Sequence, residues 1–228
     1  MEKSPNYEIG YTLVGASVWF LCYVPANVTV FLIVFAGYIQ AQMLALAEEL
    51  LHLWPDAELH YKNLDFSEFR RYNFNKERVL NDFIRRSLED IIRKHAMNVN
   101  LLKQLEELFA GAIALEFMLL MLGLIAELLG GLQDTYLEVI YAFVQVAMDC
   151  WIGQQVMDAS VAFERAVYGC RWENFDVSNM KVVLQILGNA QRTMKLSAGG
   201  VTMLSFASLM SVVKSIYSAY TTLRTAIK

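Results

Sequence analysis

Residues 9–47 read IGYTLVGASVWFLCYVPANVTVFLIVFAGYIQAQMLALA and contain no charged side chain. This run of 39 residues is far longer than the roughly 20 that cross a bilayer as a helix. Gly10–Val24 alone is short for a separate span, and no turn-forming cluster surrounds Pro25. We therefore predict one helix that is kinked at Pro25. A helix over Tyr11–Leu53 would extend beyond the hydrocarbon at about 1.5 Å per residue, and Trp54-Pro55 is predicted to end it.

The composition agrees with a membrane protein built from helices. Hydrophobic residues make up 56% of the 228 residues, charged residues only 18%, and there are just three prolines. The net charge of −4 gives no basic field that would attract a nucleic acid, so no nucleic-acid partner is expected. The three cysteines are widely spaced and fit neither a disulfide framework nor a zinc site. We predict an all-α integral membrane protein.

A second long helix follows a charged segment. Residues 48–107 hold 10 of the 19 Lys and Arg residues and all three His residues, a composition that belongs outside the bilayer. Apolar residues recur there at steps of three and four, as in an amphipathic helix; they are Leu80, Ile84, Leu88, Ile91, Val99, Leu102, Leu105 and Phe109. The pattern continues without a breaker into Phe109–Leu129, so this second span is predicted to extend a cytosolic helix until Gly130-Gly131 stops it.

Two further spans are predicted in the remaining sequence. Gln133–Tyr168 forms a helical stretch whose uncharged core, Val139–Met148, is short. Leu196–Val213 is an uncharged segment of 18 residues that follows a short amphipathic helix. Gly199-Gly200 is expected to split the last helix. The prediction is thus four long transmembrane helices that extend into a cytosolic helical anchor.

The distribution of Lys and Arg sets the orientation, because cytosolic loops carry their excess. Residues 48–107 have 10 and residues 165–195 have 5, whereas the turn at 130–138 has none. Both basic segments are therefore expected in the cytosol and both termini outside. Met1 is followed by no signal peptide, and its charged start before an outward-facing N-terminus is a hint that Met1 is not the natural beginning.

Chemistry inside the spans is limited to a few polar residues. Glu116 interrupts the second span, and a carboxylate there is costly unless it faces protein or water. It could contact an ion or a ligand, or it could lie close to the inner interface or be paired within the bundle; Asp149 and Asp158 raise the same alternatives. HExxH, GxSxG and Gly-rich phosphate loops are absent. No catalytic residue, metal site or cofactor is expected, so the protein is not predicted to be an enzyme.

The last helix offers two interpretations. Tandem glycines remove side-chain bulk and permit positive φ, so Gly199-Gly200 is either a simple helix break or a hinge between a cytosolic anchor and a moving final helix. The final helix also carries small and hydroxylated residues from Ser205 to Thr225. Such residues allow close helix packing or line an aqueous pore.

Several segments resemble insect odorant receptors. The run at residues 189–200, NAQRTMKLSAGG, is similar to a C-terminal signature of that family, although Thr193 stands where the family often has Pro. The segments at 211–215 and 217–221 resemble its last helix, and Tyr168 with Trp172 resembles the segment before the final cytosolic helix. Ser4–Tyr11 looks like the stretch before the family's fourth membrane helix. The resemblance covers nearly the whole chain.

This resemblance implies the architecture of a ligand-gated channel. Family members have seven spans, so the chain looks like the last four. Four subunits, normally tuning receptors with a shared odorant co-receptor, form a heterotetrameric cation channel opened by a volatile odorant in the plasma membrane of sensory neurons, with the C-terminus extracellular. The implied division is an outer tail and first span at 1–53; a cytosolic loop, anchor helix and second span at 54–130; a third span at 131–172; a cytosolic anchor helix at 173–198; and a final pore-type span at 199–228.

The expected functional residues fall into four groups. An odorant pocket is expected where apolar and aromatic groups of the first and third helices converge. The resemblance implies that the final helix lines the pore and that an aliphatic ring near its outer end is the gate; two aliphatic residues four apart there share one helical face. Subunit assembly is expected along the anchor helix at about Arg78–Leu108, because no soluble domain of this chain can cover its apolar stripe. The residues are Val18, Trp19, Cys22, Tyr136, Ile140 and Phe143 for the pocket; Leu223 and Ile227 for the gate; Gly199 and Gly200 for the hinge; and Leu88, Ile92 and Leu102 for assembly.

Two other functions stay open on the sequence. The chain could be a truncated, non-conducting membrane interaction protein whose anchor helices still assemble with partners. It could also be a gustatory-type relative of the same superfamily, although the C-terminal motif is of the odorant type. The coding sequence upstream of Met1 would separate the receptor from the truncated protein.

Overall fold

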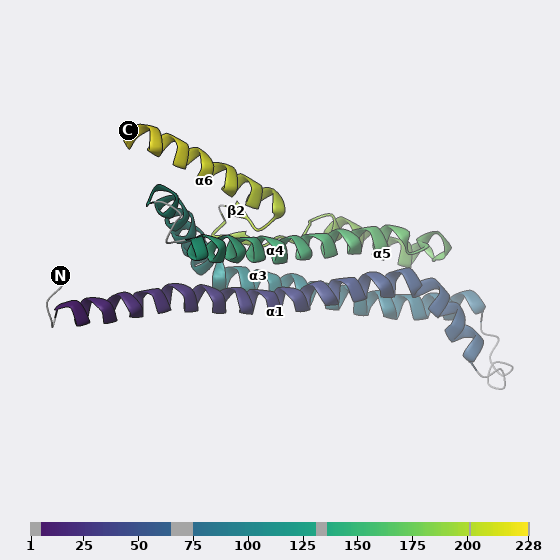
Figure 1. Ribbon diagram of the computed structural model, residues 1–228. Helices are drawn as coiled ribbons and strands as arrows, with labels where there is room; N and C mark the ends of the chain where they lie inside the picture. Colours follow the sequence, from purple (N-terminus) through teal and green to yellow (C-terminus); the bar gives the residue numbers. More distant parts are fainter. Residues whose placement is uncertain (1–5, 65–74, 131–135, 201, 228) are drawn as a thin grey trace. The chain divides into compact units, whose positions relative to one another are not determined.

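The computed structural model describes residues 6–64, 75–130, 136–200 and 202–227. The described chain is almost entirely helical (Figure 1). Its elements are α1 (Asn6–Asn63), α3 (Lys76–Gly130), α4 (Tyr136–Gly169), the short 3-10 helix η1 (Trp172–Asn174), α5 (Val177–Ala190), strands β1 (Ser197–Ala198) and β2 (Thr202–Met203), and α6 (Phe206–Ile227). The predicted all-α fold is confirmed.

Helix starts follow from capping side chains. The Asn75 side-chain oxygen accepts from the backbone N–H of Glu77 at 3.2 Å, before α3. The Asp176 carboxylate accepts from the N–H of Asn179 at 2.8 Å and caps α5. Ser205 accepts from the N–H of Ser208 at 3.2 Å, at the start of α6. Each cap satisfies a donor that the first turn of a helix leaves without an intrahelical partner.

Helix α1 is longer than predicted. The expected end at Trp54-Pro55 is wrong, because α1 continues to Asn63. Pro55 removes one hydrogen bond from the helix, but packing holds the chain on both sides of it. Leu53 and Ala57 are buried, and the Trp54 ring stacks on Phe175 with centroids 6.2 Å apart. A proline thus interrupts a helix less where its neighbours have buried partners.

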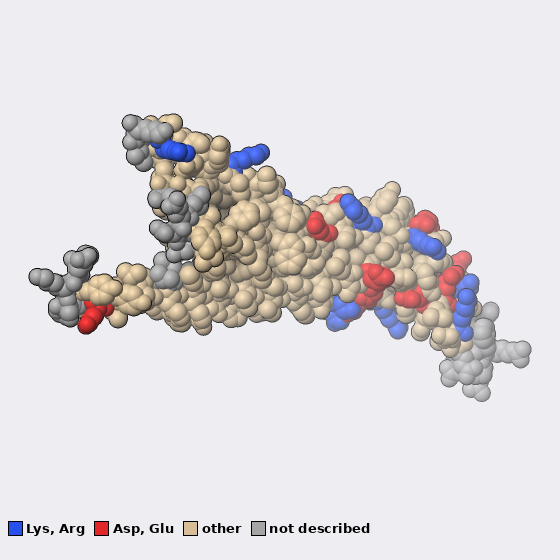
Figure 2. Space-filling view, viewed as in Figure 1, with Lys and Arg blue, Asp and Glu red and all other residues tan. Residues whose placement is uncertain are grey.

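The chain divides into two compact units, which the long helices cross. The apolar unit comprises the described residues within 1–35, 106–154 and 196–228. The charged unit comprises those within 36–105 and 155–195. Figure 2 shows Lys, Arg, Asp and Glu side chains gathered over the second half of α1, the end of α4 and α5, and few over the first half of α1. The charged side chains thus lie mainly in one of the two units, and the division into spans and a cytosolic anchor stays a prediction.

The core of the charged unit contains the predicted stripe of α3. Leu80, Ile84, Leu88 and Ile91 are all buried, as the periodicity predicts, and they share this core with Phe163 of α4. Val99 of the same predicted stripe is exposed. The amphipathic helix is therefore confirmed, and this chain itself covers most of its apolar face.

The connection into α6 is a small hairpin. Strands β1 and β2 pair antiparallel, with Ser197 opposite Met203 and Ala198 opposite Thr202. Gly199 and Gly200 follow β1 with φ of 62° and 73°, in the left-handed region that glycine adopts without strain. The glycines thus separate the last two helices as predicted. The predicted span Leu196–Val213 starts too early, however, since its first part forms this hairpin and α6 begins at Phe206.

Two helices are long and apolar enough to cross a membrane by themselves, among the residues that the structure describes. They run over Tyr7–Asn63 and Lys76–Ala126. Many large apolar side chains of the apolar unit are exposed, including Tyr11, Leu13 and Leu122. Apolar surface of this extent requires lipid or further protein to cover it.

Candidate functional site

A chain of buried polar side chains joins α1, α3 and α4 inside the apolar unit. The Thr29 hydroxyl donates to the Asp149 carboxylate at 2.7 Å. The Gln145 amide nitrogen lies within hydrogen-bond distance of Thr29 Oγ1, and it donates to Glu116 Oε1 at 3.0 Å and to the carbonyl oxygen of Pro25 at 3.1 Å. One amide of α4 therefore holds side chains of two other helices and a main-chain oxygen.

Glu116 and Asp149, the two acids among these linked side chains, make fewer hydrogen bonds than their oxygens can accept. Glu116 is 5% exposed and Asp149 is 0% exposed. Glu116 Oε2 and Asp149 Oδ2 have no hydrogen-bond partner among the described residues. An uncompensated carboxylate at the middle of a bilayer costs roughly 2.5–3.5 kcal/mol on insertion scales. Buried, unpaired oxygens at such a cost are expected at a functional position rather than in ordinary packing.

Helix α4 also supplies polar partners where α1 contains proline. Pro25 has no N–H to donate within α1. Close to it, the Tyr141 hydroxyl donates to the carbonyl oxygen of Cys22 at 2.9 Å, and Gln145 donates to the carbonyl of Pro25 itself. These bonds add partners to carbonyl oxygens beside the proline, and they tie α4 to α1 at this level.

A cavity of about 240 Å³ adjoins this polar chain. It lies between α1 and α3, and Glu116 is the one charged residue among the described residues that line it. The other lining residues are apolar: Phe20, Val24, Pro25, Val28, Ala112, Leu115 and Leu119. Sites for small organic molecules have this character, with apolar walls and a few placed polar groups.

The residues expected to form an odorant pocket do not line this cavity. Trp19, Tyr136, Ile140 and Phe143 are exposed, as is Cys22. The ring of Trp19 stacks on Tyr23 of the same helix, with centroids 4.6 Å apart. The side chain of Val18 lies outside the described part of the structure. Hydrogen bonding joins α1 and α4 near these positions, at Cys22, but no described cavity connects them.

The hinge glycines are held from two sides. The Ser197 hydroxyl bonds to the Glu106 carboxylate of α3 and accepts from the N–H of Gly200 at 3.2 Å. A Cβ at Gly199 would lie 2.8 Å from the Cβ of Ala114 in α3, so no side chain fits without movement. The N–H of Phe206 donates to Gln154 Oε1 of α4 at 3.4 Å. The start of α6 is thus tied to both α3 and α4.

The expected gate residues lie at the far end of α6. Ile216 is buried with Leu124 of α3 and Ala142 of α4. Leu223 follows Ile216 by seven residues, which places it on the same helical face about 20° away, but its own side chain is exposed. The side chain of Ile227 lies outside the described part of the structure. The hydroxylated residues form another face, and several bond to their own helix, such as Ser215 to the carbonyl of Ser211 at 2.9 Å.

The expected assembly residues differ in accessibility. Leu88 is 0% exposed and Leu102 is 5% exposed, whereas Ile92 is 39% exposed. The premise that this chain cannot cover the stripe is wrong, because most of the stripe is buried within the chain. The same part of α3 contacts α1, α4 and α5. Only Ile92 of the three offers its side chain to a partner.

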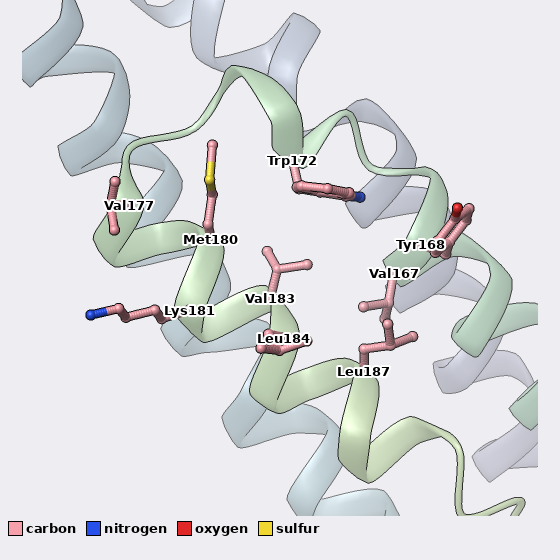
Figure 3. A pocket seen from close by; sticks show the side chains of 9 residues that line it. All are labelled: Val167, Tyr168, Trp172, Val177, Met180, Lys181, Val183, Leu184 and Leu187. Atoms are coloured by element: carbon pink, nitrogen blue, oxygen red, sulfur yellow. The ribbon is translucent and has the colours of Figure 1, made fainter.

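A more accessible apolar surface lies at the end of α4 (Figure 3). We name it the α4–α5 groove, a hollow of about 390 Å³. It is lined by Val167, Tyr168, Trp172, Val177, Met180, Lys181, Val183, Leu184 and Leu187. Figure 3 shows the Trp172 ring between the end of α4 and α5. Tyr168, Val177 and Leu184 are exposed, so this groove is open to another molecule.

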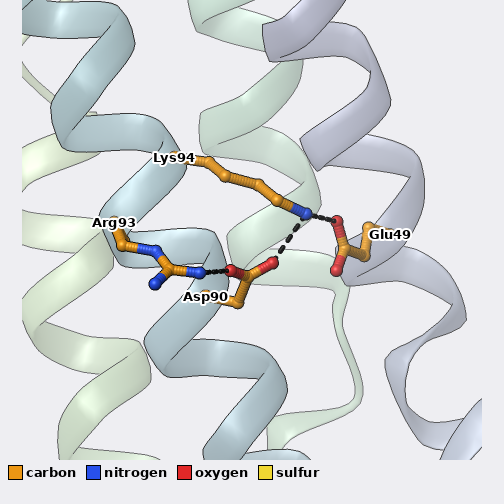
Figure 4. Close-up of polar contacts among 4 residues, drawn as sticks. All are labelled: Glu49, Asp90, Arg93 and Lys94. Carbon is orange, nitrogen blue, oxygen red and sulfur yellow. Dashed lines mark hydrogen bonds and ion pairs between the residues drawn. The ribbon is translucent and has the colours of Figure 1, made fainter.

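An ion-paired cluster ties α1 to α3 within the charged unit (Figure 4). Lys94 contacts the Asp90 carboxylate at 2.7 Å and Glu49 of α1 at 3.4 Å, and Arg93 also pairs with Asp90. Hydrogen bonds from Lys94 and Arg93 hold the pKa of Asp90 below its usual value, and the bond to Asp90 raises the pKa of Lys94. Because all four side chains are partly or largely exposed, water screens these pairs and their contribution to stability is small.

Sequence reasoning missed the residues that build the polar chain. Gln145 lies within an uncharged core and gave no signal. Thr29 belongs to Asn27-Val28-Thr29, which matches a glycosylation sequon but lies inside a span, and this match does not indicate a role in hydrogen bonding. Gly153 of α4 was also missed, although its lack of a side chain lets the main chain of Leu204 lie directly against it. Each of these roles depends on a neighbour more than 50 positions away.

Comparisons with known proteins agree with this fold. Residues 1–217 match the model of the family described as 7tm Odorant receptor. The solved structures that match include the insect olfactory receptor OR5 from Machilis hrabei in complex with eugenol, with a TM-score of 0.56 at 11% sequence identity. That match covers 90% of this chain and 69% of OR5. No curated protein matches. Since the family model spans nearly the whole sequence, the chain belongs to the insect odorant receptor family.

Proposed function

We propose that this chain is a subunit of an odorant-gated cation channel that assembles with co-receptor subunits as a heterotetramer. The observation that carries the proposal is the match of residues 1–217 to the 7tm Odorant receptor family. Members of this family are multi-pass membrane proteins that serve as odorant receptors, and the odorant-type match argues against a gustatory-type function. Eugenol in the OR5 structure supports a small volatile molecule as the ligand.

The proposed odorant pocket uses the exposed apolar face shared by α1 and α4. Trp19, Cys22, Tyr136, Ile140 and Phe143, together with Val18, are the candidates. The exposure of the first five side chains supports a site that closes only when other segments cover them. Large aromatic groups supply much of the contact area in small-molecule sites.

Assembly is proposed to use the charged unit in the cytosol. The α4–α5 groove, with Leu184 and Trp172 at its surface, and the exposed Ile92 of α3 are the accessible apolar groups that support this role. Leu88 and Leu102 are proposed to act indirectly, by holding the core on which these surfaces rest.

The gate is proposed at Leu223 and Ile227 of α6, where two aliphatic rings in a tetramer would stop ions by dewetting. Gly199 and Gly200 are proposed as the hinge that lets α6 move. The tie between α6 and the two helices α3 and α4 supports this role, because movement of either helix would act on the start of α6. The lysine and arginine bias supports a cytosolic charged unit and an extracellular C-terminus in the plasma membrane of sensory neurons.

The test is co-expression of this chain with an odorant co-receptor in a cell that has no other receptor. A cation current evoked by a panel of volatiles including eugenol, above the current of co-receptor alone, supports the proposal. Co-purification of the two proteins without such a current would support the alternative, a non-conducting membrane interaction protein. Absence of both would reject either role.

A further inference from the structure

The cavity beside Glu116 combines apolar walls with a single acid. Phe20 and Val28 of α1 and Leu115 of α3 line it, and no residue that lines it carries a positive charge. Its volume of about 240 Å³ is below the roughly 300–1,000 Å³ of sites for drug-sized ligands. The cavity therefore fits a small molecule with a compact apolar body.

Only one oxygen of the Glu116 carboxylate has a hydrogen-bond partner among the described residues. Gln145 donates to Oε1 at 3.0 Å and thereby holds the carboxylate in place. Oε2 has no partner among the described residues, although the residue is more than nine-tenths buried. The other acid among the linked side chains, Asp149, accepts a hydrogen bond from the Thr29 hydroxyl. Asp149 therefore provides no positive charge to pair with Glu116. A buried carboxylate with a free oxygen lacks the cation or donor that such groups have in proteins.

We propose that this cavity binds a small organic ammonium ion, with the Glu116 carboxylate as its counter-charge. Oε2 itself exposes almost no surface, so the Glu116 side chain must turn slightly as the ligand enters. The ammonium group then supplies a charge-assisted hydrogen bond to Oε2, and the apolar body of the ligand lies against the side chains of α1 and α3. The aromatic ring of Phe20 adds a surface that attracts cations. The inference rests on the proposed function only for the role of the ligand in gating, and it places this ligand between α1 and α3 rather than between α1 and α4.

The probe is cyclohexylamine, compared with cyclohexanol, which has the same ring and no charge. Binding of each labelled compound is measured by equilibrium dialysis against the purified chain in phosphatidylcholine nanodiscs, with empty nanodiscs subtracted. We expect saturable binding of cyclohexylamine that is more than about tenfold tighter than that of cyclohexanol. Glu116→Gln should weaken amine binding by about the same factor, and Ala112→Phe, which fills the cavity, should remove it.

The control is Glu89→Gln, the same chemical change at an exposed, ion-paired position of α3, and it should bind the amine as the parent does. Equal binding of amine and alcohol by the parent would overturn the proposal, as would unchanged amine binding in Ala112→Phe. Unchanged binding in a folded Glu116→Gln variant would also overturn it. If that variant fails to fold, the comparison of the two ligands and Ala112→Phe decide. Because no current is measured, a chain that binds the amine but forms no channel rejects only the proposed function.

Discussion

Gly153 of α4 lies directly against Leu204, whose main chain occupies the space that a side chain at position 153 would need. Leu204 is fully buried, and its N–H donates to the carbonyl oxygen of Leu196 at 2.9 Å. The close approach therefore seats the segment just before α6 on the middle of α4. A backbone neighbour cannot move aside as a flexible side chain can.

Gly153→Ala is expected to destabilise the apolar unit by about 1–3 kcal/mol, because the new methyl group meets a carbonyl oxygen in a packed core. Denaturant unfolding in detergent, followed by circular dichroism, measures the change. Gly188→Ala in α5 is the control. Nothing lies within 4 Å of a Cβ there, so it should stabilise the protein by up to about 1 kcal/mol through helix propensity. Equal effects of the two substitutions would contradict the close packing at Gly153.

Gly199→Ala is expected to be destabilising for two reasons. Its φ of 62° costs a residue with a side chain about 1–2 kcal/mol, and its Cβ would meet the Cβ of Ala114 at 2.8 Å. Ala114→Gly removes only the second effect, so a double-mutant cycle should give a favourable coupling between positions 199 and 114. Gly200→Ala is the control, since it has positive φ without a neighbour. Equal coupling of Ala114→Gly to both alanines would rule out the contact.

His95 is expected to make the charged unit sensitive to acid. Its ring stacks on buried Phe163 with centroids 4.6 Å apart, and burial lowers the pKa of His95 below the usual 6.5. The unfolded chain therefore binds the proton more readily, and stability falls as the pH drops below about 6.5. Unfolding measured between pH 7.5 and 5.5 should show this loss in the parent and a smaller one in His95→Phe. His52→Gln, at an exposed histidine of α1, is the control: it leaves His95 in place and should keep the loss of stability in acid.

Leu184→Asp is expected to weaken assembly with the co-receptor at least about tenfold, because a charge in an apolar interface must be desolvated. Pull-down from detergent-solubilised membranes measures it, with thermal unfolding of the variant as a check on folding. Leu59→Asp places the same charge on an exposed leucine of α1 outside the α4–α5 groove and should leave assembly unchanged. If Leu184→Asp co-purifies as the parent does, the groove is not the interface.

Cysteines on two faces of α6 test the proposed gate. Leu223→Cys in the channel should react with a charged thiol reagent and lose current, because its side chain would line the pore. Ser218→Cys lies on the hydroxylated face, about 140° around the helix from position 223, and should react without loss of current. Loss of current at Ser218→Cys alone would instead make the hydroxylated face the pore lining.

The local features of the fold could be predicted from the sequence. Hydrophobic period and length predicted the long helix of α3 and its buried stripe at Leu80, Ile84 and Leu88, because a helix repeats every 3.6 residues whatever its partner. Tandem glycine predicted the break before α6. The prediction that the first helix ends at Trp54-Pro55 was wrong because a proline weakens only one helical turn. The contact that stabilises the helix there comes from Phe175, more than a hundred positions away.

The candidate site could be predicted only in part. Glu116 and Asp149 stand out as acids in apolar segments, but their link through Gln145 and Thr29 depends on how three helices turn toward one another. Likewise, the sequence of α3 alone indicates that Leu88 and Leu102 must be covered, and it does not indicate which segment covers them. Side-chain contacts between distant helices are set by packing geometry, which local pattern does not contain.

The amide of Gln145 has one more consequence. Its two N–H hydrogens lie within reach of three acceptors, Pro25 and Thr29 of α1 and Glu116 of α3, so these hydrogen bonds fit one alignment of the three helices. If one helix slid by one residue, it would shift by about 1.5 Å along its axis and turn by about 100°. The hydrogen bonds among these side chains would break, and the two acids would lose their partners. Any opening movement must therefore carry α1, α3 and α4 together at this level.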